Sequence, residues 1–300
     1  MARHDADWAV QQYEAVRDVL PVADMPAQSK HAANLEELAE DIDVFLLDAF
    51  GVLNVGNTAI PGAPKRVEAL KDMGKRVLVV TNGATVPADK AQEKYKGFGF
   101  DFDLQDIVSS RDAMTGALQK RPMAERWAAM SASGSQLETL GVPCERLRME
   151  PAVYDAADGF LLLSSSEWDD AQQNLLRESL RRFPRPVIVG NPDIVAPREY
   201  GLSREPGYFA YALMQELGLQ PHLFGKPFGN IFDLALTRFP KDDPSRIAMV
   251  GDTLHTDVLG GAARGFKTVL VTDHGLFAGR DYDAYIRQTS IVPDYIIPEI

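Results

Sequence analysis

Short apolar runs separated by helical stretches constrain the fold of this chain more than any other feature. Each run has four or five residues, most of them apolar, and amphipathic segments lie between the runs. The runs are VFLL (44–47), RVLVV (76–80), GFLLL (159–163), PVIVG (186–190), RIAMV (246–250) and KTVLV (267–271). Runs of this kind are typical of parallel strands buried on both faces. The sequence therefore predicts an α/β fold built on a doubly wound, Rossmann-like parallel sheet.

Changes in composition divide the chain into three parts. Residues 1–42 contain WAVQQYEAVRDVL and NLEELAEDI, whose helical spacing predicts a helical leader packed on the first strand, with Asn34 as an N-cap. Proline-bearing edges flank a second βα-like series, which predicts an inserted α/β cap domain over residues 123–221. Residues 43–122 and 222–300 then form the main domain.

Charge and composition narrow the classes of partner and compartment. The formal net charge is −12 and no strong basic cluster is present, which argues against a nucleic-acid partner. No apolar run approaches the roughly 20 residues of a membrane span, and the N-terminus lacks an apolar signal core. Cys144 is the single cysteine, so no intrachain disulfide forms. We expect a cytoplasmic protein that binds neither nucleic acid nor membrane.

Polar side chains follow several of the predicted strands. Asp48 follows 44–47, Thr81 and Asn82 follow 76–80, and Asp252 follows 246–250. In open parallel sheets, ligands bind outside the carboxyl ends of the strands, so these side chains are expected to converge on one crevice.

The segment GDTLHTD carries the most specific signal. It places Asp252 and Asp257 five positions apart, in a glycine-flanked loop after a buried strand. Two carboxylates there are costly for the fold alone but suit an oxygen-rich cation site. Lys226, in FGKP, adds a positive charge. Together with Asp48 and Thr81, these residues offer a nucleophile, a hydroxyl donor, a cation and metal ligands.

Four motifs in this order carry a family resemblance. They are LLDAFGVL followed by IPGA, then VVTNGAT, GKP and GDTLHTDVLGG, with GNPD at 190–193 between the second and third. From about residue 40 to residue 300, the chain resembles the haloacid dehalogenase-like (HAD) hydrolase superfamily. It is most similar to the NagD-like class IIA, whose members carry a large cap between the second and third motifs.

The resemblance implies a Mg²⁺-dependent phosphohydrolase that acts on a small phosphorylated metabolite through an aspartyl-phosphate. The implied catalytic residues are Asp48 as nucleophile, Lys226 and Thr81. The implied substrate-binding residues are Thr81, Asn82, Gly83, Lys226 and Asn191. The implied Mg²⁺ ligands are Asp48, the backbone carbonyl of Phe50 and Asp252, with Asp257 beside them. A homodimer formed through the cap would also fit the resemblance.

Phe50 departs from the pattern of the superfamily. In most of its phosphatases an aspartate two residues after the nucleophile protonates the leaving group, a contribution worth ~10² to 10⁴ in rate. Phenylalanine cannot donate that proton. Three functional hypotheses stay open. They are a phosphohydrolase with weakened acid–base catalysis, a phosphometabolite-binding sensor or partner protein, and a dehalogenase or carbon–phosphorus lyase.

Three more residues, together with Asn191, are candidates for contact with the substrate. His255 and His274 follow strand ends near the carboxylate loop and could supply a proton, although a surface or capping role is more common for such a histidine. Asn191 and Asp193, in GNPD, could contact a substrate from the cap or could only form a turn.

Overall fold

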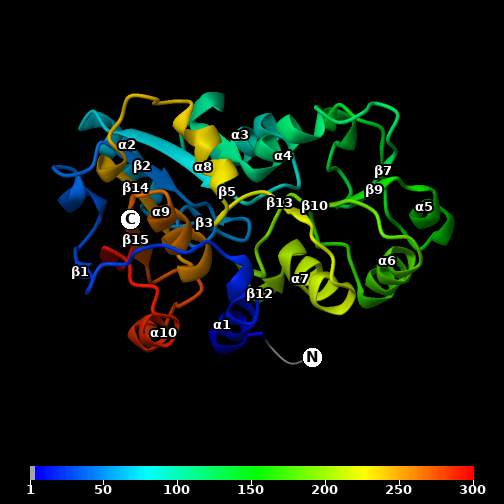
Figure 1. Cartoon of the computed structure of the whole chain (residues 1–300). Coiled ribbons are helices and arrows are strands. Elements are labelled where there is room, and N and C mark those ends of the chain that lie inside the picture. The colour runs from blue at the N-terminus through cyan, green and yellow to red at the C-terminus, as the bar shows by residue number, and fades with distance from the viewer. Residues whose placement is uncertain (1–3) are drawn as a thin grey trace.

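Strand β2 (Val44–Leu47) lies inside a seven-stranded sheet in the computed structural model, which describes residues 4–300. It pairs in parallel with β14 (Ile247–Gly251) on one side and β5 (Arg76–Thr81) on the other. Every residue of β2 is fully buried, because helices cover both faces of the sheet. The predicted α/β fold with a parallel sheet is confirmed (Figure 1).

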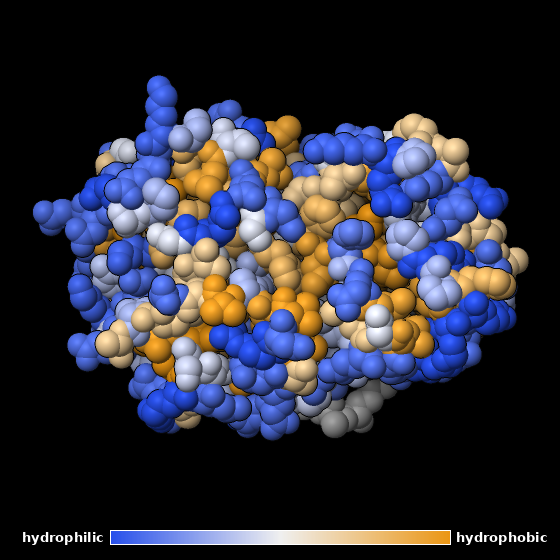
Figure 2. Space-filling view, viewed as in Figure 1, coloured by the Kyte–Doolittle hydropathy of each residue, from blue (hydrophilic) through white to orange (hydrophobic). Residues whose placement is uncertain are grey.

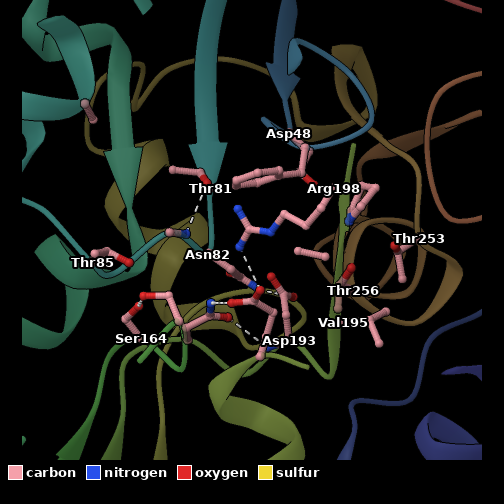
Figure 3. Close-up of a pocket in the computed structure, with 18 of the residues that line it drawn as sticks. Asp48, Thr81, Asn82, Thr85, Ser164, Asp193, Val195, Arg198, Thr253 and Thr256 are labelled. Atoms are coloured by element: carbon pink, nitrogen blue, oxygen red, sulfur yellow. Dashed lines mark hydrogen bonds and ion pairs between the residues drawn. The ribbon is translucent and has the colours of Figure 1, made fainter. Parts of the chain in front are cut away.

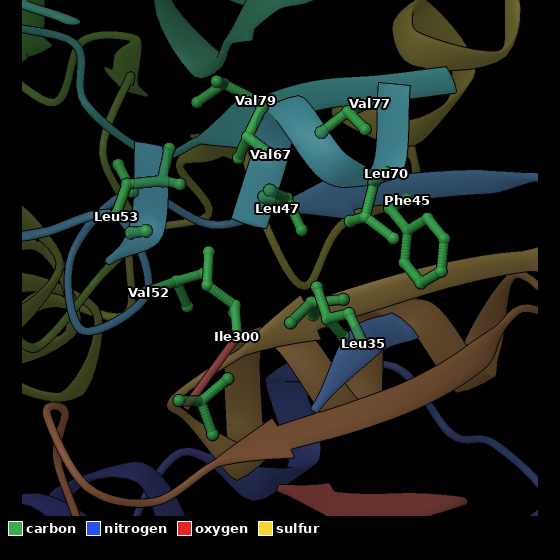
Figure 4. Packing of buried hydrophobic residues seen from close by; sticks show 14 of the residues in the cluster. Leu35, Phe45, Leu47, Val52, Leu53, Val67, Leu70, Val77, Val79 and Ile300 are labelled. Carbon is green, nitrogen blue, oxygen red and sulfur yellow. The ribbon is translucent and has the colours of Figure 1, made fainter. Parts of the chain in front are cut away.

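The outer strands complete the order β1-β16-β15-β14-β2-β5-β6. They are β1 (Lys30–His31), β16 (Tyr295–Ile297), β15 (Lys267–Val271) and β6 (Ile107–Ser109). The helices of this part are α2 (Ala63–Asp72), α3 (Ala88–Gly97), α4 (Ser110–Leu118), α8 (Gly229–Leu236), α9 (Leu259–Ala263) and α10 (Tyr282–Thr289). Alternate side chains of β2 enter different clusters: Phe45 and Leu47 pack with residues of α2 (Figure 4), and Leu46 packs with residues of α8. This two-sided burial is what the continuous apolar runs require.

A second parallel sheet of five strands lies beside the first (Figure 1). Its order is β13 (His222–Leu223), β10 (Val187–Val189), β9 (Gly159–Leu162), β7 (Trp127–Met130) and β8 (Cys144–Arg146). Its helices are α5 (Pro151–Ala156), α6 (Asp170–Arg182) and α7 (Pro206–Leu217). Hydrophilic residues cover much of the outer surface in Figure 2, and hydrophobic ones gather between the two lobes.

Two short hairpins, one from each lobe, contact each other. One follows Asp48 and consists of β3 (Asn54–Val55) and β4 (Thr58–Ala59), and the other consists of β11 (Val195–Arg198) and β12 (Gly201–Arg204). The carboxylate of Glu199 accepts hydrogen bonds from the Asn57 N–H at 2.7 Å and the Thr58 hydroxyl at 3.3 Å. The middle segment therefore contacts the main sheet's first loop directly.

The structure differs from the sequence prediction near two segment boundaries. Helix α1 (Ala6–Glu14) packs in the cluster of Leu254 and Val258 rather than on β2, although Leu35 and Leu38 of the same predicted leader do pack with β2. Strand β1 adds an edge strand within the leader. Strand β13 pairs with β10, so the smaller sheet extends past residue 222. Edge strands of two residues are too short to leave a periodic pattern. The division into leader, core and cap stays a prediction.

Within residues 4–300, every helix is too short or too polar to cross a lipid bilayer.

Candidate active site

Three adjacent strands bring the predicted polar residues together. Asp48 follows β2, Thr81 ends β5, and Asp252 follows β14. Because β2 lies between the other two strands in parallel register, the three side chains meet at one edge of the sheet. The Asp48 N–H also donates to the Val250 carbonyl at 2.8 Å, which fixes the start of the loop.

A single π-helical turn over Leu254–Val258 returns Asp257 to the end of β14. The Asp257 carboxylate accepts a hydrogen bond from the Thr253 N–H at 3.1 Å. This return requires a glycine at position 251, because a Cβ there would lie 2.0 Å from the Asp257 carboxyl carbon. The spacing of Asp252 and Asp257 in the sequence therefore corresponds to two carboxylates on one side of a tight loop.

Asp48, Asp252 and Asp257 form a carboxylate cluster, with one oxygen of each within 4.8 Å of the others. Asp252 is oriented by the Leu276 N–H at 2.7 Å and the Thr253 hydroxyl at 2.9 Å. Within residues 4–300, no backbone hydrogen bond ends on the carbonyl oxygen of Phe50. This set of hard oxygen donors fits a divalent cation such as Mg²⁺.

Lys226 lies against this cluster and is only 1% exposed. Its Nζ is 2.6 Å from Asp48 Oδ1 and 2.7 Å from Asp257 Oδ1. Burial alone would lower the pKa of Lys226, but the charges of Asp257 and Asp48 outweigh it and raise the pKa. When all three carboxyl groups are ionised, one ammonium leaves two negative charges in excess, which again fits a divalent cation.

The pKa values of Asp48 and Asp252 are both raised. Burial raises the pKa of Asp48 to about 6, although Lys226 opposes the shift. Burial and then the charges of Asp257 and Asp48 raise the pKa of Asp252 to about 8. Both carboxyl groups would ionise more readily beside a bound cation.

Thr81 and Asn82, at the end of β5, line the cavity and also hold neighbouring backbone groups. Thr81 lines the cavity, and its hydroxyl oxygen accepts from the Gly83 N–H at 3.1 Å. The Asn82 amide bonds both backbone groups of Lys226, at 2.7 and 2.9 Å, and donates to Asp193 at 2.7 Å (Figure 3). Asn82 therefore positions the Lys226 loop and joins it to the middle segment.

A cavity of about 340 Å³ lies between the strand ends and the hairpin β11–β12. Of the predicted site residues, those that line it are Asp48, Phe50, Thr81, Asn82, Gly83, Asn191, Asp193 and Asp252. Lys226 and Asp257 do not line it and are buried behind it. Asn191 also accepts from the Asp193 N–H at 3.0 Å, so it forms a turn as well as lining the cavity.

The cavity also contains residues that sequence reasoning missed. Lys94 comes from α3, Arg198 from β11, and Glu205 pairs with Arg198 at 2.8 Å. Lys94 Nζ lies 4.9 Å and the Arg198 guanidinium carbon 4.6 Å from the centre of the Phe50 ring. No motif marks these side chains, since only the folded hairpin brings them together.

Neither candidate histidine lines the cavity. His255 is buried, lies 2.7 Å from a Glu14 carboxylate oxygen, and stacks on Tyr13 with ring centres 4.9 Å apart. Burial lowers the pKa of His255 despite Glu14. His274 instead lies 3.4 Å from Glu299. Both side chains occupy structural positions outside the cavity.

Comparison with known families agrees with this geometry. Residues 45–142 match a family model described as haloacid dehalogenase-like hydrolase, and residues 223–299 match a second, HAD-hydrolase-like model. The two matches contain the strand ends that carry Asp48, Thr81 and Asp252.

Two curated human proteins resemble nearly the whole chain. Glycerol-3-phosphate phosphatase is 28% identical over 90% of this chain and 92% of its own length. Chronophin is 30% identical over 85% of this chain and 90% of its own length.

Solved structures extend the comparison. A structure described as a possible sugar phosphatase from Cytophaga hutchinsonii has a TM-score of 0.80 and 26% identity, covering 90% of this chain and 98% of that one. Glycerol phosphate phosphatase from Mycobacterium tuberculosis, solved with calcium, has a TM-score of 0.66 and 25% identity, covering 86% of this chain and 74% of that one. Motifs, fold and relatives together place this chain in class IIA of the haloacid dehalogenase-like hydrolase family, several of whose members are named as phosphatases.

Proposed function

We propose that this protein is a Mg²⁺-dependent phosphohydrolase that acts on a small phosphorylated metabolite. The observation that carries the proposal is the carboxylate cluster of Asp48, Asp252 and Asp257, with Lys226 bridging two of its members. A phosphate monoester is a dianion, so a carboxylate can attack it only where positive charge is supplied. The buried ammonium and a divalent cation would supply that charge.

Asp48 and Asp252 both line the cavity, and Asp48 is the proposed nucleophile because its side chain is partly exposed whereas Asp252 is buried. One Asp48 oxygen attacks phosphorus and the bond from phosphorus to the leaving oxygen breaks, which gives an aspartyl-phosphate. Water then attacks that phosphorus and regenerates the carboxylate. Lys226 holds Asp48 in place and offsets its charge, and Thr81 lies where its hydroxyl can contact the phosphoryl oxygens.

Mg²⁺ would be held by Asp48, Asp252 and the Phe50 carbonyl, with Asp257 beside them, and would neutralise phosphoryl charge. The calcium complex of the M. tuberculosis relative supports a divalent ion in this type of site. The excess of negative charge in the cluster supports the same conclusion from this chain alone.

The source of the leaving-group proton distinguishes this chain from the usual pattern. Phe50 stands where most phosphatases of the superfamily have an acidic residue, and its side chain cannot give up a proton. Two carboxyl groups outside the cluster, those of Asp193 and Glu205, line the cavity. Burial, reinforced by the charge of Asp48 against that of Lys226, raises the pKa of Asp193 well above its usual value. Asp193 is therefore the proposed replacement for the missing acid.

Phe50 also supports a second candidate function. A protein that binds a phosphorylated metabolite as a sensor needs the charge-neutralising groups but no proton donor, and this chain keeps those groups while Phe50 replaces the usual donor. The dehalogenase interpretation receives less support, because a halide-releasing enzyme would not require the carboxylates of Asp252 and Asp257.

Phosphate release from alkyl, aryl and acyl phosphates, with Mg²⁺ and with excess chelator, separates the two candidates. A phosphohydrolase releases phosphate only with the metal, and Asp48→Asn abolishes release while Asp43→Asn, a change at a surface ion pair, does not. Binding of these compounds without any release would favour the sensor and overturn the phosphohydrolase.

A further inference from the structure

Lys94 is a half-buried ammonium that faces the cavity without a partner of opposite charge. Within residues 4–300, no carboxylate lies in ion-pair distance of its Nζ, whereas Lys90, one turn earlier on α3, pairs with Glu93 at 2.8 Å. The carboxylate of Glu199 is close enough to influence Lys94, but it already accepts from Asn57 and Thr58. The cavity therefore contains an uncompensated positive charge.

Arg198 adds a second cation to the same place. Its guanidinium group is fixed by Glu205 at 2.8 Å and by the Ser203 hydroxyl oxygen at 3.0 Å. Arg198 and Lys94 both lie against the ring of Phe50, at 4.6 and 4.9 Å from its centre. Burial and then the charge of Arg198 lower the pKa of Lys94 to about 8. Contact with the ring offsets part of this repulsion, and an anion would offset more.

The two cations lie near the proposed site of chemistry but are separate from it. Lys226 is the cation that contacts Asp48, and Lys94 and Arg198 come from α3 and from the hairpin of the middle segment. In Figure 3 the Arg198 side chain extends into the cavity below the strand ends that carry Asp48 and Thr81. The volume of about 340 Å³ suits a small metabolite that reaches both places.

We infer that the substrate carries a second anionic group, a carboxylate or another phosphate, which binds to Lys94 and Arg198 while its phosphoryl group faces Asp48. This inference rests on the proposed phosphohydrolase function and adds the substrate class. Glu205 already pairs with Arg198, so Lys94 supplies most of the free charge. Phe50 then serves as the surface that holds both cations beside the nucleophile.

Two matched pairs of substrates test the inference. 3-Phosphoglycerate has a carboxylate where glycerol 3-phosphate has a hydroxymethyl group. Propane-1,3-diol bisphosphate has a second phosphate that its monophosphate lacks. For the wild-type protein with Mg²⁺, we expect that in at least one pair the compound with the second anionic group has a kcat/KM about 10-fold or more above that of its partner. Lys94→Met removes that preference through KM, and it leaves kcat and the rates on glycerol 3-phosphate and the monophosphate nearly unchanged. Lys90→Met, on the exposed side of α3, changes neither.

An equal loss on both members of a pair in Lys94→Met would overturn the inference, since it would place Lys94 on the transferring phosphoryl group. The absence of any preference in the wild-type protein would overturn it as well. Calorimetric binding of each pair to the Mg²⁺-loaded Asp48→Asn variant, with and without Lys94→Met, reads the preference independently of turnover. If no compound releases phosphate but the binding preference persists, the phosphohydrolase proposal fails and the anion site stands.

Discussion

Asp48→Asn should stabilise the metal-free protein while it abolishes activity. Burial raises the pKa of Asp48 from 3.8 to about 6, so the folded state holds its proton more tightly than the unfolded chain does. For an acid with a raised pKa, the stabilisation is complete below the unfolded pKa and is lost as the pH rises through the folded pKa. The wild-type protein therefore loses stability between about pH 4 and about pH 6, and asparagine avoids that loss.

The shift of about two pKa units sets an upper limit of about 3 kcal/mol on the gain. Because Asp252 and Asp257 share the same cluster, we expect about 1 to 3 kcal/mol at pH 8, or a rise in Tm of roughly 2 to 4 °C per kcal/mol. At about pH 3 the gain should nearly vanish, because both states of the wild-type protein are then largely protonated at this position.

Thermal and denaturant unfolding in chelator at both pH values measures the effect. Asp43→Asn is the matched control: a hydrogen bond from Arg246 lowers the pKa of Asp43 to about 2, so the same substitution should cost stability at pH 8. With saturating Mg²⁺ the wild-type protein should become the more stable of the two, because Mg²⁺ binding stabilises the folded state and Asp48 is one of the proposed ligands. An Asp48→Asn protein that is less stable than wild type at pH 8 in chelator, or equally stabilised at both pH values, would refute the reasoning.

Three further predictions concern the proton donor and the metal. In the Asp193→Asn background, where the proposed donor is absent, Phe50→Asp should raise kcat on alkyl phosphates by up to ~10²-fold with less gain on p-nitrophenyl phosphate, and a leaving-group series run beside thermal melts would expose an unselective effect. Asp193→Asn keeps an acceptor for Asn82 but loses the acid, so it should slow alkyl phosphates far more than p-nitrophenyl phosphate; unchanged ratios in this variant would leave Asp193 a purely structural role. Asp252→Ala should abolish tight Mg²⁺ binding in calorimetry, and undiminished affinity would remove Asp252 from the ligand set.

The sequence predicted those parts of the site that are set by local structure. Asp48, Thr81 and Asp252 could be placed because each follows a buried apolar run, and parallel strands bring their carboxyl ends to one edge. Asp257 followed from its spacing to Asp252. In each case a short segment of chain fixes the position of the side chain.

Residues that depend on long-range contacts could not be predicted in the same way. Arg198 reaches Phe50 only because the hairpin β11–β12 contacts Asn57 and Thr58, more than 130 positions away in the sequence. The substrate-binding role that the motif implies for Asn82 stays a prediction, whereas the hold of its side-chain amide on the Lys226 backbone left no signal in the sequence. His255 followed a strand end as expected, but the π-helical turn directs it towards α1 and Glu14. Such orientations depend on packing between distant segments and leave no periodic signal.

Trapping of the proposed aspartyl-phosphate tests the central claim most directly. Borohydride reduces an acyl phosphate to the alcohol, so a quench during turnover converts a phosphorylated aspartate to homoserine, which peptide mass spectrometry can locate. We predict homoserine at position 48, only when both Mg²⁺ and a phosphorylated substrate are present, and none in Asp48→Asn. Release of phosphate with no reduction at position 48, or with reduction at another carboxylate, would contradict the assignment of Asp48 as the nucleophile.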